Sequence, residues 1–173
     1  AGGVYYTPSY IVDYIVKQTI EPLLKTKKAK AKDSLKLFGH GKHSASRLKI
    51  LDPACGSGSF LLGAYQFLLD WYLEQYLQEP KKWVTGKKPR LYQASGGLWK
   101  LTISERKRIL LNHIYGVDID LQAVEVTKLS LLLKVLEDEQ SVISQLYLFK
   151  ERVLPDINNN IKCGNSLIGD EFY

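Results

Sequence analysis

The sequence contains no methionine, only two cysteines and no uninterrupted run of 18 or more apolar residues. A run of that length is needed for a membrane-spanning helix, so we expect none, and we expect no signal peptide before Tyr5. Two cysteines, Cys55 and Cys163, are too few for a disulfide framework, and both lie in short glycine-containing motifs. We therefore expect two buried thiols in a reducing cytoplasm. The lack of methionine and the Ala-Gly-Gly start indicate a piece of a longer protein.

Hydrophobic residues make up 45% of the 173 residues, and eleven residues are tyrosine, which is typical of one globular domain over residues 1–173. The net charge of +6 is unevenly distributed. Residues 25–49 and residues 81–108 each hold nine Lys or Arg and one acid, whereas the rest of the chain holds 6 basic and 16 acidic residues. Such confinement suggests a polyanionic partner. The alternative is a pair of solvated, lysine-rich insertions, at about 25–47 and 79–103.

The central motif of the chain is LDPACGSGSF, residues 51–60. It joins a short apolar segment at 48–51, which predicts a buried strand, to an apolar run at 59–77, which predicts a helix. A strand, a glycine turn and a helix in that order form a ligand cradle at the carboxyl end of a parallel strand. Gly56 and Gly58 let the backbone approach a ligand closely, and the first amides of the helix attract anions or carboxylates.

The residues around these glycines exclude two common ligands. The third glycine of the dinucleotide pattern G-x-G-x-x-G is missing, and no Lys-Ser or Lys-Thr pair completes a phosphate-binding loop. Asp52 would repel a pyrophosphate and suits a cationic ligand with an amino group. The alternative is an ordinary turn between a strand and a helix.

A second predicted strand, residues 114–120, ends in Asp118 and Asp120 and is followed by an apolar helix over 123–136. In nucleotide-binding α/β sheets, an acid at the end of the second strand accepts hydrogen bonds from ribose hydroxyls, usually about 20 residues after the glycines. Asp118 follows Gly58 by 60 residues, and the long helix and the basic insertion between them account for the difference. Asp120 has the weaker claim to the ribose, and it could instead cap the helix. Alternatively, both acids are exposed loop residues.

The N-terminal part predicts an amphipathic helix. Thr7 is a plausible N-cap with Pro8 at the first helical position, and apolar residues follow at helical spacing, namely Val12, Val16, Ile20 and Leu24. Pro22 should interrupt or kink this helix.

Between the motifs, residues 25–46 read as a flexible connector, and a short helix is expected over 104–112 with Ser104 as its N-cap. The insertion at 79–103 carries Trp83, Tyr92 and Trp99 among its lysines. These aromatics either stack on nucleic-acid bases or pin the insertion onto the domain. Near the C-terminus, residues 161–168 predict a third strand that ends in Asn165 and Ser166.

Together these motifs resemble those of γ-type adenine-N6 DNA methyltransferases of restriction–modification systems, and most closely the large fused restriction–modification enzymes. The glycine motif resembles motif I, Tyr-Tyr-Thr-Pro at residues 5–8 motif X, the Asp118 strand motif II and the Asn165 strand motif III. The resemblance covers nearly the whole chain. It implies a doubly wound, mostly parallel, Rossmann-like α/β fold, here truncated, that binds S-adenosyl-L-methionine.

The resemblance also implies roles for individual residues. Thr7 and its neighbours would touch the methionine end of the cofactor, Asp118 the ribose and Ile119 the adenine face. Asn165 would accept a hydrogen bond from the exocyclic amine, although many relatives carry Asp there. The implied cofactor-binding residues are Tyr6, Thr7, Pro8, Asp52, Pro53, Ala54, Cys55, Gly56, Ser57, Gly58, Asp118, Ile119, Asn165 and Ser166.

The catalytic motif of the family, Asn/Asp/Ser-Pro-Pro-Tyr/Phe, is missing, because the six prolines are all isolated. We therefore assign no catalytic and no metal-ligating residue, and we expect the cofactor-binding half of an enzyme that is inactive alone. The implied partners of the parent protein are double-stranded DNA with a flipped-out target adenine, a recognition domain and, in fused enzymes, a nuclease. Two alternatives are an RNA or protein-amide N-methyltransferase and a non-catalytic cofactor-binding scaffold.

Overall fold

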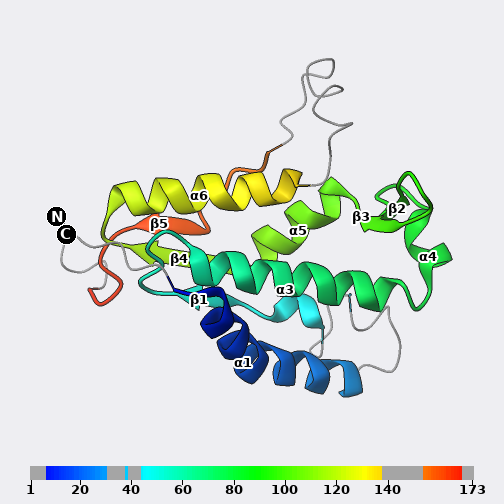
Figure 1. The fold of residues 1–173 in the computed structure, drawn as a ribbon, viewed down its shortest axis with the longest axis horizontal. Coiled ribbons are helices and arrows are strands. Elements are labelled where there is room, and N and C mark those ends of the chain that lie inside the picture. Colours follow the sequence, from blue (N-terminus) through cyan, green and yellow to red (C-terminus); the bar gives the residue numbers. More distant parts are fainter. Residues whose placement is uncertain (1–6, 31–37, 39–43, 138–153, 169–173) are drawn as a thin grey trace, which may run out of the picture.

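The computed structural model describes residues 7–30, 38, 44–137 and 154–168, and Figure 1 shows their arrangement. Its helices are α1 (Ser9–Lys30), the 3-10 helix η1 (Ala45–Arg47), α3 (Ser59–Tyr76), α4 (Pro80–Val84), α5 (Ile103–His113) and α6 (Leu121–Leu136). Its strands are β1 (Ile50–Asp52), β2 (Leu91–Gln93), β3 (Trp99–Leu101), β4 (Ile114–Asp118) and β5 (Ile161–Cys163). None of the described helices is both long enough and apolar enough to cross a membrane.

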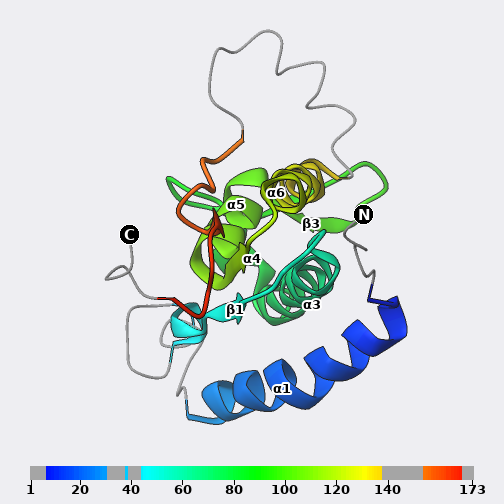
Figure 2. The ribbon, with the colours of Figure 1, turned by 90° about the vertical axis from the view of Figure 1, so that its left-hand side faces the viewer.

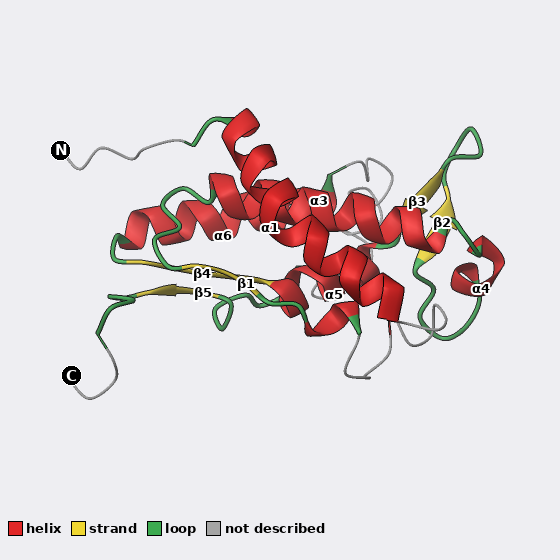
Figure 3. Cartoon of the chain, turned by 90° about the horizontal axis from the view of Figure 1, so that it is seen from below, coloured by secondary structure: helices red, strands yellow, loops and turns green. Residues whose placement is uncertain are grey.

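The chain has an α/β fold around a parallel sheet in the order β1-β4-β5. Asp52 lies opposite Gly116, and Asp118 lies opposite Cys163, so the carboxyl ends of the strands meet at one edge of the sheet. Helices α3 and α6, which follow β1 and β4, lie on the same side of this sheet, which Figure 3 shows from its edge. The predicted parallel α/β arrangement is thereby confirmed.

Alternate residues of these strands have very different surroundings, as expected for the twofold period of a strand. Ile50, Ile114 and Ile161 are buried on the side of α3 and α6. Leu51, which points to the opposite face, is 60% exposed. The described residues therefore leave one face of a parallel sheet open, although such sheets are usually covered on both faces.

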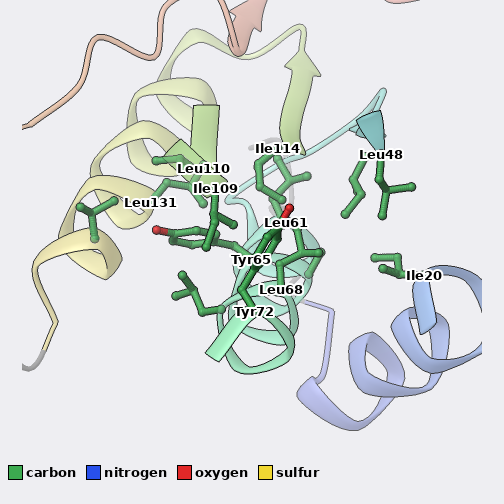
Figure 4. Packing of buried hydrophobic residues seen from close by; sticks show 14 of the residues in the cluster. Ile20, Leu48, Leu61, Tyr65, Leu68, Tyr72, Ile109, Leu110, Ile114 and Leu131 are labelled. Atoms are coloured by element: carbon green, nitrogen blue, oxygen red, sulfur yellow. The ribbon is translucent and has the colours of Figure 1, made fainter. Parts of the chain in front are cut away.

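Helix α3 forms the centre of the hydrophobic core (Figure 4). Its three tyrosines, Tyr65, Tyr72 and Tyr76, are fully buried, and each hydroxyl has a hydrogen-bond partner, as buried polar groups require. The Tyr65 hydroxyl donates to the Arg106 carbonyl at 3.0 Å, and the Tyr76 hydroxyl donates to the Glu105 carboxylate at 2.5 Å. These bonds fix α5 against α3.

Helix α1 is amphipathic as predicted, and its buried positions are Val12, Val16, Ile20 and Leu24. It packs closely on α3, because a Cβ atom added at Gly63 would lie 2.3 Å from the Val12 Cγ1 atom. The helix begins at Ser9, so Pro8 precedes its first residue instead of occupying it. It continues past Pro22 to Lys30, so the predicted interruption does not occur.

The described parts of the predicted flexible connector at 25–46 have regular or buried structure, so that prediction is wrong for them. Helix α1 extends through Lys30, and Ser44 caps the short helix η1 by accepting from the Ser46 amide at 3.1 Å. Phe38 is buried with its ring centroid 4.7 Å from that of Tyr76. Residues 31–37 and 39–43 lie outside the described residues.

The insertion forms α4 and the antiparallel hairpin β2–β3, which lie at the opposite end of α3 from the parallel sheet (Figure 1). Trp83 is buried with its ring centroid 4.8 Å from that of Tyr76. The Arg90 guanidinium stacks over the Trp83 ring, with 4.8 Å between its Cζ atom and the ring centroid. Trp83 therefore pins the insertion onto the domain, which was one of the two predicted outcomes for its aromatics.

A buried carboxylate also holds the base of the insertion. Glu105 is 3% exposed, and Arg108 donates to it at 2.6 Å, while the Arg90 Nε atom lies 3.9 Å from its other oxygen. Arg106 donates to the Val135 carbonyl at the end of α6, where the helix dipole favours a cation. Three of the basic residues between 81 and 108 thus serve internal contacts.

The cap of α5 differs from the prediction. Thr102, in extended conformation, accepts a hydrogen bond from the Glu105 amide at 3.3 Å, whereas Ser104 lies inside the helix. The sequence Thr-x-x-Glu at 102–105 has the spacing of a capping box, which explains why the threonine is the cap. The predicted N-cap, Ser104, is therefore wrong by two residues.

Candidate ligand site at the carboxyl ends of the strands

The glycine turn after β1 has the backbone conformation that its glycines allow. Gly56 and Gly58 have φ angles of +52° and +82°, in the left-handed region that favours glycine. Gly58 is the N-cap of α3 and offers no side chain to the amides of the first turn. Because such amides also lack partners within a helix, they are available to a ligand.

The glycine turn is held by hydrogen bonds to the second strand–helix unit, which consists of β4 and α6. The Cys55 amide donates to the Val117 carbonyl of β4 at 2.9 Å, and the Gly56 amide donates to the Asp118 carboxylate at 2.8 Å. On the other side, the Thr127 hydroxyl of α6 donates to the Gly56 carbonyl at 2.8 Å. The sequence analysis missed Thr127, because a threonine within the apolar helix 123–136 gives no sign of a bond to a residue 71 positions away.

Two carboxylates lie close together beside this turn. Asp52 ends β1 and accepts from the Ala54 amide at 3.1 Å. Burial raises the pKa of Asp52, the nearby charge of Asp118 raises it further, and the Ala54 amide works in the opposite direction. The same site raises the pKa of the Cys55 thiol to about 11, through burial and then the charges of Asp52 and Asp118. Cys55 is therefore a neutral packing residue, and the site as a whole favours a cation.

Asp118, at the end of β4, contacts the glycine turn and the residues that follow β4 and β5. One of its carboxylate oxygens accepts from Gly56, and the other accepts from the Asp120 amide at 2.9 Å. A carboxylate has about four lone-pair positions, so two positions remain for a ligand. Asp120 instead caps α6 by accepting from the Gln122 amide at 2.8 Å, which confirms the capping interpretation. Ile119, between the two acids, is 74% exposed.

The third strand end reaches the same edge, but β5 ends at Cys163 and not at Asn165–Ser166 as predicted. Cys163 is exposed, so the expected burial of its thiol is wrong. The Gly164 amide donates to the Asp118 carbonyl at 2.9 Å, which places the residues that follow beside β4. The Asn165 side-chain oxygen accepts from the Leu167 amide at 3.0 Å. Asn165 therefore stabilises a turn, and its oxygen retains one lone pair for a ligand.

One residue of the predicted N-terminal contribution, Thr7, shares a cavity with the start of α3. Thr7 and Ser59, the first residue of α3, line one cavity of about 310 Å³ between α1, α3 and α6. Figure 2 shows α3 lying between α1 and α6. Pro8 is exposed, and Tyr6 lies outside the described residues. In the part of the chain that the structure describes, no three His, Cys, Asp or Glu side chains are grouped as metal ligands would be.

Comparison with known families places these features in context. A family model described as "MmeI, DNA-methyltransferase domain" matches residues 26–170, which include the glycine turn, Asp118 and Asn165. The chain belongs to this family. Thr7 and α1 up to Lys25 lie outside the matched range.

Two curated relatives of this chain are named as type II restriction enzymes and methyltransferases, and a third is named as an adenine-specific methyltransferase. The chain is 32% identical over 192 residues to a putative type II restriction enzyme and methyltransferase, RM.MjaORFECS2P, of Methanocaldococcus jannaschii, covering 96% of this chain. It is 32% identical over 166 residues to the type II restriction enzyme and methyltransferase RM.Eco57I of Escherichia coli, covering 95%. The adenine-specific methyltransferase BrxX of Escherichia coli O9:H4 is 26% identical over 81% of the chain. The chain spans 14% of the length of the first two relatives and 11% of the third.

Proposed function

We propose that this chain is the S-adenosyl-L-methionine-binding part of a site-specific adenine-N6 DNA methyltransferase of a restriction–modification system. The observation that carries the proposal is the glycine turn held by Asp118 beside a second carboxylate, Asp52. The cofactor carries an ammonium and a sulfonium group, which two nearby carboxylates attract. Its own carboxylate suits the first amides of α3, and its ribose suits the remaining lone pairs of Asp118.

The other residue roles follow from the same orientation of the cofactor. Thr7, in the cavity beside Ser59, would contact the methionine end, with Tyr6 and Pro8 nearby in sequence. Residues 53–57 would line the ligand with their backbone, because their small side chains permit close approach. Ile119, with its exposed side chain, would cover the adenine face, and Asn165 and Ser166 would lie at the adenine edge.

The fold that we propose is a truncated, doubly wound Rossmann-like sheet, with residues 1–173 as one subdomain of the parent protein. In such sheets the strand order reverses beside the first strand, and ligands bind at that point. Strand β1 is at an edge of the described sheet, and Leu51 is exposed on its open face. A further strand and helix from the remainder of the parent would cover both.

The substrate that we propose is adenine in double-stranded DNA, flipped out of the helix. Two curated relatives are named restriction enzyme and methyltransferase, and a third is named adenine-specific methyltransferase, which supports this choice. The target pocket would come from the rest of the parent, because the sequence has no Pro-Pro pair. We also propose that the protein lies in the cytoplasm, where its DNA substrate is found.

Methyl transfer from tritiated S-adenosyl-L-methionine tests this proposal. The parent enzyme and this chain alone are each incubated with adenine-containing DNA, with RNA and with protein. We expect label in DNA adenine for the parent and none for this chain alone. Label in RNA or protein but not in DNA would favour an N-methyltransferase of another substrate class. A parent that binds the cofactor and labels nothing would favour the scaffold, and labelled DNA from the short chain would show that we have misplaced the catalytic site.

A further inference from the structure

The backbone of Gly56 is held at both of its polar groups by the second strand–helix unit. Its amide donates to Asp118 at the end of β4, and its carbonyl accepts from Thr127 in α6, each at 2.8 Å. Residues of a glycine turn are conformationally permissive and would otherwise sample several backbone conformations. These two bonds select one conformation for the turn that opens α3.

The hydroxyl of Thr127 is used in an unusual way for a helical threonine. Threonine within a helix commonly donates to the carbonyl four residues earlier, as Thr19 does to Ile15 at 2.7 Å and Thr26 does to Pro22 at 2.9 Å. Thr127 is fully buried, and its hydroxyl instead donates to the Gly56 carbonyl, in the turn that packs against α6. Its hydroxyl therefore joins α6 to the turn.

The shape of the turn fits this contact. A Cβ atom added at Gly58 would lie 2.8 Å from both the hydroxyl oxygen and the methyl carbon of Thr127, so only glycine leaves room for this side chain. Gly56 and Gly58 thus both lie against Thr127 of α6. The Gly56 carbonyl accepts its hydrogen bond, and Gly58, which has no side chain, leaves room for it.

We propose that Thr127 is a positioning residue that sets the conformation of the turn at 55–58 and so directs the first amides of α3 toward the carboxylate of the ligand. The inference rests on the proposed function. It assigns to Thr127 no contact with the cofactor, because its side chain is buried behind the turn. The part of the ligand most affected is the amino-acid end, since that end carries the carboxylate.

The test uses two ligands and two substitutions. S-adenosylhomocysteine carries the amino-acid carboxylate, whereas 5′-methylthioadenosine has the same nucleoside and lacks that end. Thr127→Val keeps the shape of the side chain and removes the hydroxyl, and Thr127→Ala removes the hydroxyl without placing a methyl group against the Gly56 carbonyl. Thr127→Ser keeps the hydroxyl, and Thr19→Val removes the hydroxyl of an exposed threonine that bonds within its own helix, α1.

Calorimetric titration should show that Thr127→Val and Thr127→Ala bind S-adenosylhomocysteine about tenfold more weakly than wild type, because one buried hydrogen bond is lost. Their affinity for 5′-methylthioadenosine should fall by less than about threefold, and Thr127→Ser and Thr19→Val should bind both ligands within about twofold of wild type. A purely structural role would weaken the two ligands equally. Circular dichroism at the assay temperature establishes that each variant is folded, and the alanine variant replaces the valine variant if the latter is not.

Two outcomes would overturn the inference: unchanged affinity for S-adenosylhomocysteine in both hydroxyl-free variants, or an equal loss for both ligands. A different outcome concerns the proposed function itself. If folded wild-type protein binds neither ligand, the cofactor assignment is wrong, and the role of Thr127 in ligand binding is wrong with it.

Discussion

Asp118 combines a structural role with the proposed ligand-binding role. Its carboxylate accepts from the amides of Gly56 and Asp120, so it holds the glycine turn while two of its lone pairs remain open to ribose hydroxyls. A substitution at this position therefore removes two interactions that act on the same ligand. Asp120, two residues later, carries the same charge but caps α6.

Replacing Asp118 with alanine should lower the affinity for S-adenosylhomocysteine by tenfold or more. The loss of one charge-assisted hydrogen bond is worth about 1.5–3 kcal/mol, and the loosened turn adds to it. Asp120→Ala is the matched control, which removes an equal charge close by and should weaken binding far less. Calorimetric titration of both variants is the measurement. Equal affinities for wild type and Asp118→Ala would mean that the ribose contact is misassigned.

The sequence indicated several individual residues correctly. Gly56 and Gly58 have positive φ angles, and Asp118 and Asp120 lie at a strand end and a helix cap, because these roles depend on local backbone geometry. Thr127 could not be predicted in the same way. Its partner is distant along the chain, and nothing in the neighbouring residues specifies a tertiary hydrogen bond.

At the level of elements, His113 links α3 and α5 to the segment that precedes β1. It is fully buried, with the Leu48 carbonyl 2.7 Å from its Nδ1 atom and the Tyr72 hydroxyl 2.9 Å from its Nε2 atom. A carbonyl can only accept, so Nδ1 carries a proton and donates to Leu48. In the neutral imidazole, Nε2 then accepts from the Tyr72 hydroxyl.

Burial lowers the pKa of His113 from 6.5 to about 4; the Leu48 carbonyl opposes this shift, and the charges of Arg108 and Lys49 reinforce it. Because the unfolded chain binds the proton more readily, the stabilising effect is complete above pH 6.5 and is lost as the pH falls toward 4. The free energy of unfolding should thus decrease by up to about 3 kcal/mol from this residue.

Chemical denaturation of wild type and His113→Gln between pH 7.5 and pH 4 measures this contribution. Glutamine offers a donor and an acceptor but does not titrate, so the variant keeps the effects of Asp52 and the other carboxylates. The wild type should lose more stability on acidification than the variant. Parallel pH dependences would contradict the assignment of a buried neutral imidazole.

The helices could be predicted from hydrophobic periodicity, and α1, α3, α5 and α6 all occur near their expected positions. The connector could not. Phe38 packs against the rings of Tyr72, Tyr76 and Trp83, which are distant in sequence. The lysine-rich sequence around Phe38 gives no sign of these contacts. The interruption expected at Pro22 does not occur, since Leu24 and Ile20 on either side of it are packed in the core and the helix is continuous.

On the scale of the whole molecule, α3 separates the proposed cofactor site from the basic insertion. Its 18 residues span about 27 Å at the rise of an α-helix. Lys81, Lys87 and Lys88 are exposed at the far end, whereas Arg90 of the insertion and Arg108 of α5 lie against the buried Glu105 carboxylate. The charge pattern alone left a polyanionic partner and solvated, lysine-rich insertions as alternatives. It could not separate these two classes of basic residue, because that distinction depends on the buried carboxylate of Glu105.

The central claim is that the glycine turn and the two carboxylates bind S-adenosyl-L-methionine and not a dinucleotide. Isothermal titration of the folded wild-type chain with S-adenosylhomocysteine and, separately, with NAD tests it most directly. The account predicts saturable binding of S-adenosylhomocysteine and none of NAD, since Asp52 and Asp118 repel a pyrophosphate and attract an ammonium group. Binding of NAD, or failure to bind S-adenosylhomocysteine, would contradict it.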